Sequence, residues 1–206
     1  MKLTLKSAIA ATALLLAAPV SAASLSTGFS GANGSSGNMF DISVGSSNLT
    51  LTDLQVHIDQ AITTTVSFWY RDGSYVGNEN SSSGWTLWDS AALDGAGVTN
   101  PTGWDIADLM LNANSTYGIY IHDNNSAIGY ANAVSQGLVA AQNADLTIFS
   151  GIGRSLNADP FAAVTHGART WEGTMTYTTT PAVPLPASGL LLVAGAGALA
   201  GLRRRK

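Results

Sequence analysis

The residue types that most often carry out catalysis are few in this 206-residue sequence and show no known catalytic spacing. There is no cysteine, which excludes thiol catalysis, disulfides and cysteine-bound metals. The serine elbow, HExxH, P-loop and EF-hand patterns do not occur in its folded part. His57 falls on the polar side of a predicted strand, whereas His122 and His166 fall in predicted loops far from it. We therefore predict no catalytic residues.

Paired carboxylates are the other route to catalysis, because a glycosidase needs two of them roughly 5 to 10 Å apart. Only Glu79 and Glu172 are glutamates among the thirteen acidic residues, and nothing in their spacing pairs them. A secreted hydrolase, in which two carboxylates or a serine, a histidine and an aspartate converge in one cleft, is kept as the least favoured alternative.

Calcium is the one cofactor that the loop composition suggests, because Ca²⁺ takes carboxylate and carbonyl oxygens from loops. Asp123 and Asn125 lie in an Asp-Asn-Asn-Ser turn, and Asp89 with Asp94 is a second acidic pair. Such turns also cap strands through side-chain-to-backbone hydrogen bonds, which is the structural alternative. A calcium ion held there would have a structural role.

Three tryptophans are candidates for stacking on a sugar ring. Trp69 and Trp88 fall on the side opposite the apolar residues of their predicted strands, and Trp104 follows Pro-Thr-Gly in a predicted loop. An exposed indole offers a flat apolar face with an N–H donor at its edge. The alternative is that these rings belong to the core.

Charge divides the chain into three parts, although the formal net charge is only −4. The cations gather at the two ends, and residues 23–182 contain three arginines, no lysine and all thirteen acidic residues, a net charge of −10. Nucleic-acid binding needs clustered lysine and arginine, so this middle part excludes it.

The first 22 residues have the pattern of a secretory signal peptide. Lys2 and Lys6 are followed by an apolar run over residues 8–18 and by the small-residue sequence Pro-Val-Ser-Ala. The apolar run is shorter than the roughly 20 residues that a bilayer span needs. We expect a signal helix and export, with cleavage by signal peptidase after Ala22 or Ala23.

The last 24 residues combine a proline motif, an apolar run and a basic end. Residues 188–202 predict a transmembrane helix, and the four cations after it place the end of the chain in the cytoplasm. The motif residues are Val183, Pro184, Leu185, Pro186 and Ala187, and the basic membrane stop is Arg203, Arg204, Arg205 and Lys206.

This arrangement resembles the PEP-CTERM class of bacterial sorting tails, in its Val-Pro-Leu-Pro-Ala (VPLPA) variant. The resemblance implies recognition by an exosortase-like membrane protease, delivery to the cell surface or the exopolysaccharide matrix, and a Gram-negative bacterium. A simple C-terminal anchor helix in the inner membrane is the alternative.

The middle of the chain predicts one all-β domain. Apolar residues recur at every second position, as in residues 40–44, 66–70 and 117–121, and Gly- and Asn-rich turns separate these runs. A phase slip at Thr52 and Asp53 predicts a bulge or corner. We predict an antiparallel, jelly-roll-like sandwich of eight or nine strands over residues 37–178, after a flexible leader at 23–36 and before a linker with the sorting motif at 179–187.

A second resemblance covers much of this middle part. Residues 65–70, 73–77, 84–87, 116–121, 143–148 and 169–174 are similar to an uncharacterised β-sandwich domain of secreted bacterial surface proteins. The resemblance implies no catalytic residues. We therefore expect an exported, non-catalytic surface or matrix protein, membrane-tethered as a precursor, with a lectin-like carbohydrate-binding module as the alternative.

Overall fold

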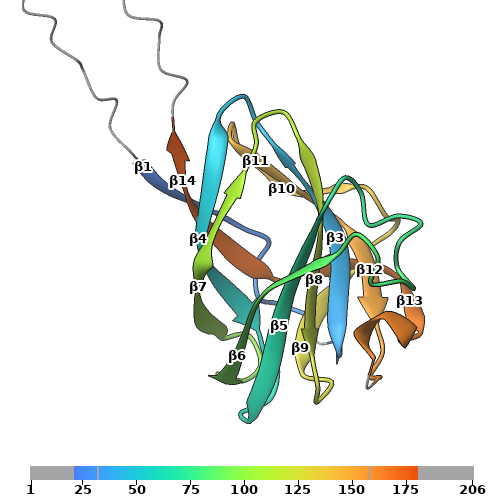
Figure 1. Ribbon diagram of the computed structural model, residues 1–206. Helices are drawn as coiled ribbons and strands as arrows, with labels where there is room; N and C mark the ends of the chain where they lie inside the picture. The colour runs from blue at the N-terminus through green and yellow to red at the C-terminus, as the bar shows by residue number, and fades with distance from the viewer. Residues whose placement is uncertain (1–20, 32, 158, 181–206) are drawn as a thin grey trace, which may run out of the picture. The chain divides into compact units, whose positions relative to one another are not determined.

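The computed structural model describes residues 21–31, 33–157 and 159–180 (Figure 1). The predicted signal helix, transmembrane helix, sorting motif and basic end lie outside these residues, apart from Ser21 and Ala22. The described part is nearly all β, with one short 3₁₀ helix, η1 (Pro160–Ala162). Its strands are β1 (Ser21–Ser26), β2 (Asn33–Ser35), β3 (Gly37–Val44), β4 (Asn48–His57), β5 (Thr63–Asp72), β6 (Thr86–Asp94), β7 (Pro101–Leu111), β8 (Thr116–Asp123), β9 (Ile128–Asn132), β10 (Val139–Gln142), β11 (Leu146–Phe149), β12 (Gly151–Arg154), β13 (Thr165–Trp171) and β14 (Gly173–Thr180).

The strands form two antiparallel sheets. The smaller sheet has the order β1-β14-β4-β7. The larger has the order β2-β9-β13-β12-β3-β8-β5-β6, and β11 joins it beside β3 and pairs with β10. The predicted all-β class with antiparallel pairing is therefore confirmed.

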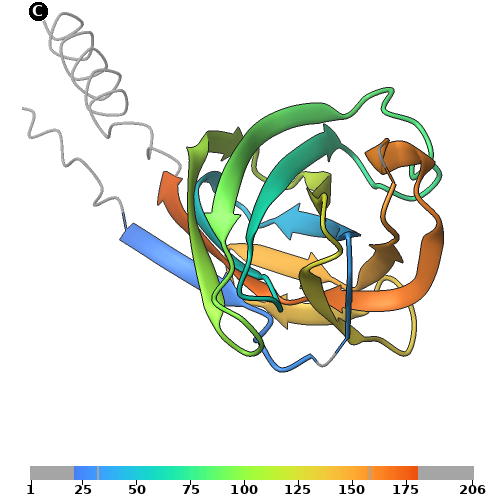
Figure 2. The same ribbon diagram turned by 90° about the horizontal axis from the view of Figure 1, so that it is seen from below.

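The main core lies between the two sheets and follows from the period-two pattern (Figure 2). In β3, Phe40, Ile42 and Val44 enter this core, while Met39 points to the other side of the sheet. Trp171 is fully buried and stacks on Phe40 with ring centroids 5.1 Å apart. We call the side of the larger sheet that faces the smaller sheet its inner face, and the opposite side its outer face.

The bulge predicted at Thr52 and Asp53 is confirmed. The register of β4 against β7 shifts between Leu51 and Asp53, and the register of β14 against β4 shifts between Thr176 and Tyr177. The extra residue keeps Leu51 and Leu54 in the core on both sides of the slip.

The flexible leader predicted at residues 23–36 is wrong, because this segment contains β1 and β2. β1 pairs with β14 along its whole length, Leu25 is buried against the main core, and the Thr27 hydroxyl donates to the carbonyl of Trp171. Small polar residues are compatible with an edge strand whose partner is already in place, so composition alone did not reveal it.

The predicted number of eight or nine strands is also wrong, since the described residues form fourteen. Three of the additional strands, β2, β10 and β12, have only three or four residues, too few to show a period. β7 was missed because Pro101 and Gly103 resemble a loop and because two successive exposed residues, Ala107 and Asp108, interrupt its alternation.

No helix in the described ranges is long and apolar enough to span a membrane.

Candidate functional site

Trp104 is not available for sugar stacking. It lies in β7 rather than in a loop, is only 4% exposed, and packs edge-on against Phe68 with centroids 6.5 Å apart. The predicted role is therefore wrong for this residue, and the core alternative holds.

Trp69 and Trp88 are half-buried and lie on opposite faces of the larger sheet. Trp69 packs on the outer face, where its Nε1 donates to Ser67 Oγ at 3.2 Å and its ring meets Phe161 edge-on at 5.2 Å. Trp88 packs against the main core, and its Nε1 donates to the carbonyl of Ala107 at 2.6 Å. The structure does not bring the three predicted tryptophans into one patch.

The Asp123 carboxylate holds its own turn together. It is fully buried and accepts hydrogen bonds from the amides of Asn125 and Ala127 and from the Thr64 hydroxyl. Burial raises the pKa of Asp123, and these hydrogen bonds oppose that shift. Asn125 Nδ2 donates to the Thr64 hydroxyl at 3.0 Å. This geometry is that of the capping alternative.

The two carboxylates of the second acidic pair also accept hydrogen bonds from the protein. Asp89 accepts from the amides of Ser90 and Ala107, and Asp94 accepts from the hydroxyl of Thr63. Within the described ranges, no three histidine, aspartate or glutamate side chains gather in a geometry that could hold a metal ion.

The histidines lie in strands, not in loops as predicted for His122 and His166, which belong to β8 and β13. His57, at the end of β4, forms a buried pair that sequence reasoning missed. Its Nδ1 is 2.7 Å from Glu172 Oε2, and its Nε2 accepts from the amide of Thr99 at 3.2 Å. The proton therefore resides on Nδ1 and is donated to Glu172.

The His57–Glu172 pair also contacts the segment between β1 and β2 and holds it against the sheets. Glu172 is 1% exposed and its other oxygen accepts from the amide of Ser30 at 2.9 Å, while the ring of Phe29 meets His57 edge-on. Both imidazole nitrogens are occupied, so the pair has a structural role in this arrangement. Glu79, the other glutamate, lies in the β5–β6 loop and accepts from the amide of Gly77.

Arg154 is a fully buried cation on the outer face. Its guanidinium donates to the carbonyls of Glu79 and Phe161 at 3.0 and 3.2 Å, to Asn80 Oδ1 and to the Thr165 hydroxyl. The acceptors are neutral oxygens, so the positive charge is not compensated by them. Burial, together with this charge, lowers the pKa of the neighbouring His122 to about 4.

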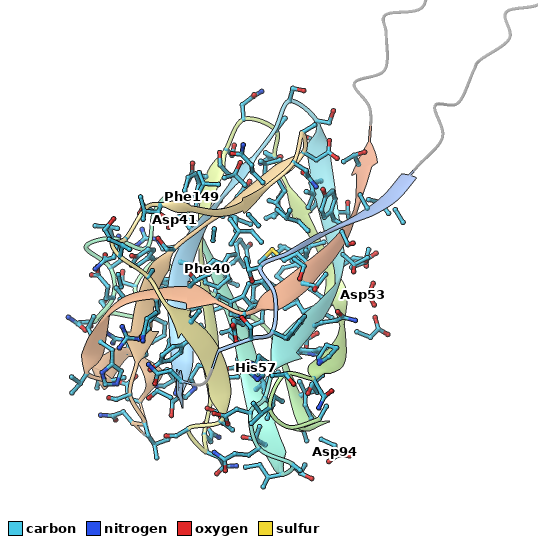
Figure 3. All side chains as sticks on the ribbon, turned by 180° about the vertical axis from the view of Figure 1, so that it is seen from behind. Phe40, Asp41, Asp53, His57, Asp94 and Phe149 are labelled. Atoms are coloured by element: carbon cyan, nitrogen blue, oxygen red, sulfur yellow. The ribbon has the colours of Figure 1, made fainter. Side chains whose placement is uncertain are left out.

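A hollow of about 390 Å³ lies on the outer face where the β5–β6 loop approaches the β9–β10 loop. Its lining includes Asp41, Tyr75, Val76, Thr116, Gln136 and Phe149, and we call it the Asp41 hollow. Figure 3 shows Asp41 and Phe149 in the same region of the molecule, away from His57.

Hydrogen bonds fix the polar side chains of the Asp41 hollow. Asp41 accepts from Ser74 Oγ at 2.6 Å and from the amide of Tyr75 at 2.9 Å, and the Tyr75 hydroxyl donates to Gln136 Oε1 at 2.9 Å. Burial raises the pKa of Asp41, while the two hydrogen bonds and the positive charge of Arg71 oppose that shift. Burial also raises the pKa of Tyr75, so its hydroxyl remains a donor at neutral pH.

The two ends of the described domain lie side by side. The antiparallel register of β1 and β14 sets Ser21 opposite Thr179, at one edge of the smaller sheet (Figure 1). Neighbouring strands are about 4.8 Å apart. The start of β1 and the end of β14 therefore lie next to each other at this edge.

Comparison of the chain with known protein families finds no matching family model, and comparison with curated proteins finds no match either.

Proposed function

We propose that the chain is an exported, non-catalytic protein of the cell surface or extracellular matrix, processed or anchored through a C-terminal sorting segment of the PEP-CTERM type. The sequence supports this through the order of its parts: an N-terminal signal peptide, an acidic domain, and the Val-Pro-Leu-Pro-Ala motif with its apolar run and basic end. The partners in this proposal are signal peptidase, an exosortase-like membrane protease and extracellular polysaccharide.

The structural observation that carries the proposal is the pairing of β1 with β14. An exported precursor has its signal segment and its C-terminal apolar segment in the same inner membrane. A domain between them would then begin and end in neighbouring strands. The pairing of β1 with β14 supports the proposal in this way, and its pairs from Ser24–Thr176 to Ser26–Thr174 remain after cleavage at Ala22 or Ala23. The domain's net charge of −10 also repels the anionic membrane surface.

Substitution of the motif tests the proposal in the full chain. Pro184→Ala combined with Pro186→Ala removes both motif prolines, and Pro181→Ala, just outside the motif, is the matched control. In the native host we expect the wild type and the control at the cell surface or in the matrix in a shortened form. The double variant should remain full-length in the inner membrane, as cell fractionation and mass spectrometry would show.

One result would contradict the sorting proposal. If the double variant and a chain truncated before Val183 reach the surface in the same amount and length as the wild type, the C-terminal segment is not a sorting signal.

A further inference from the structure

We propose that the Asp41 hollow is a binding site for one neutral sugar unit of a saccharide. This site differs from the tryptophans that the sequence suggested and does not depend on how the chain is sorted. It lies on the outer face of the larger sheet, where Asp41 and Thr116 project from the neighbouring strands β3 and β8.

The hollow has the size and the opening that a small ligand needs. Small-molecule sites span roughly 300 to 1,000 Å³, and a volume of about 390 Å³ lies at the lower end of that range. Val76 at its rim is 58% exposed and Gln136 is also exposed, so the hollow opens to solvent. These dimensions suit a single ring rather than a cofactor.

The hollow offers both hydrogen-bond acceptors and donors, which a sugar hydroxyl uses together. Each Asp41 oxygen accepts one hydrogen bond from the protein and keeps a second lone pair, and the carboxylate is held in place by Ser74 and Tyr75. Gln136 Oε1 accepts from Tyr75, and its Nε2 makes no hydrogen bond with the described part of the chain, so it can donate to a ligand. Within the described residues the Thr116 hydroxyl makes no side-chain hydrogen bond.

The electrostatics favour a neutral ligand over a charged one. The positive charge of Arg71 partly offsets the carboxylate of Asp41, and the charge of Glu79 also acts on Tyr75, so the attraction for an ammonium group is reduced rather than removed. An amide N–H₂ and a threonine hydroxyl add no second negative charge. An anionic ligand would be repelled by Asp41 and by the net charge of −10. A polyol matches all these groups at once.

The apolar part of the lining suits the C–H groups of a sugar ring. Phe149 and Val76 contribute ring and methyl surface beside the polar groups. A sugar ring has C–H groups as well as hydroxyls, so it gains from such a mixed lining, whereas a fully hydrated ion does not.

Ligand-observed NMR on the full chain in mild detergent tests the site. The neutral probes are glucose, galactose, mannose, N-acetylglucosamine and their oligomers, and the charged arms are glucosamine and glucuronate. We expect at least one neutral saccharide to bind, and its binding to be independent of the motif substitutions that test sorting.

Two variants each remove one hydrogen-bond donor from the hollow and nearly keep the shape of the side chain. Thr116→Val removes the hydroxyl, with Thr65→Val at an exposed position of β5 as its control. Gln136→Glu keeps the oxygen that accepts from Tyr75 but replaces the donor, with the exposed Gln142→Glu as its control. Losing one hydrogen bond should weaken binding roughly 3- to 10-fold in each variant, and the controls should leave it unchanged. Thermal unfolding confirms that each variant is folded.

Three outcomes would overturn the site. One is that no neutral saccharide binds to the folded wild type. Another is that saccharides bind but the affinity is the same in Thr116→Val, Gln136→Glu and their controls, which would place the site elsewhere. The third is that only glucosamine binds and that Gln136→Glu strengthens it, which would identify a cation site instead. None of these results affects the sorting proposal, which has its own variants.

Discussion

The two faces of the larger sheet are buried by different means. The inner face is covered by another sheet, and its residues share a core with that sheet, as where Phe68 packs against Trp104 of β7. The outer face is covered by two connections, the β5–β6 loop and the β12–β13 segment with η1. These contribute Tyr75, Trp85 and Phe161 to a second apolar cluster on that face, together with residues of β3, β8 and β12.

The two coverings differ in how many unpaired backbone hydrogen-bonding groups they contribute. Strands of a sheet satisfy their own backbone groups, so the inner face needs no polar partner. Loops bring carbonyls that have no strand partner, and Arg154 supplies donors to one carbonyl of each covering connection, Glu79 and Phe161. The loops also cover the outer face incompletely, and the Asp41 hollow lies where their cover ends.

The largest expected effect comes from breaking the inner face. Trp171→Ala removes a fully buried ring that stacks on Phe40, and the rigid sheets around it cannot close the cavity. We expect the free energy of unfolding to fall by about 3–5 kcal/mol, measured by denaturant unfolding.

Trp85→Ala is the matched change on the outer face. Trp85 is 8% exposed, lies in the β5–β6 loop rather than between two sheets, and donates to the carbonyl of Asn78. Its cost should be about half as large or less. Equal losses in the two variants would show that the loop cover is as rigid as the sheet.

Removing Arg154 tests whether its hydrogen bonds hold the two covering connections on the outer face. Arg154→Met keeps the aliphatic stem but leaves the carbonyls of Glu79 and Phe161 without their donor. We expect a loss of about 2–4 kcal/mol. Amide hydrogen exchange should become faster in the β5–β6 loop and around η1, while the smaller sheet keeps its protection.

Arg169→Met is the control for this prediction. Arg169 is half-buried, lies over the ring of Tyr130 at 5.3 Å and donates to the carbonyl of Ala168. Its replacement should cost less than about 1 kcal/mol. If Arg154→Met is equally mild, the loops are held by their aromatic residues alone.

Much of the fold could be predicted from the sequence because period-two alternation is local. Residues 40–44 show it, and even the bulge at Thr52 and Asp53 is visible as a phase slip. The prediction failed where the signal is not local. β1 is polar and has its partner some 150 residues later, and Pro101, Gly103 and a bulge conceal β7.

The candidate sites were largely beyond prediction because they form between distant segments. His57 and Glu172 are 115 residues apart in sequence, and neither has neighbours that mark it as paired. The Asp41 hollow depends on the approach of Gln136 to Tyr75, 61 residues away. The prediction for Trp104 was wrong because this residue, assigned to a loop, is buried in the edge strand β7.

A further expected effect is a pH dependence that originates on the outer face alone. Burial, with the charge of Arg154, lowers the pKa of His122 to about 4 from an ordinary value near 6.5. Between these two values the unfolded chain binds more protons at this residue than the folded protein does. The contribution of His122 to stability is therefore fully present above pH 6.5 and is lost as the pH falls toward 4.

His122→Phe isolates this contribution, because phenylalanine retains an aromatic ring beside Tyr120 but does not titrate. Between pH 7 and pH 5 the wild type should lose about 2 kcal/mol more of its free energy of unfolding than the variant. Asp41 and Asp123, whose pKa values are raised, act in the opposite direction in both proteins and cancel in the difference. Parallel stability curves for the two proteins would mean that His122 accepts a proton as easily in the folded state as in the unfolded chain. The loop cover of the outer face would then admit water to His122 and Arg154, and the contrast with the inner face would be one of composition rather than of burial.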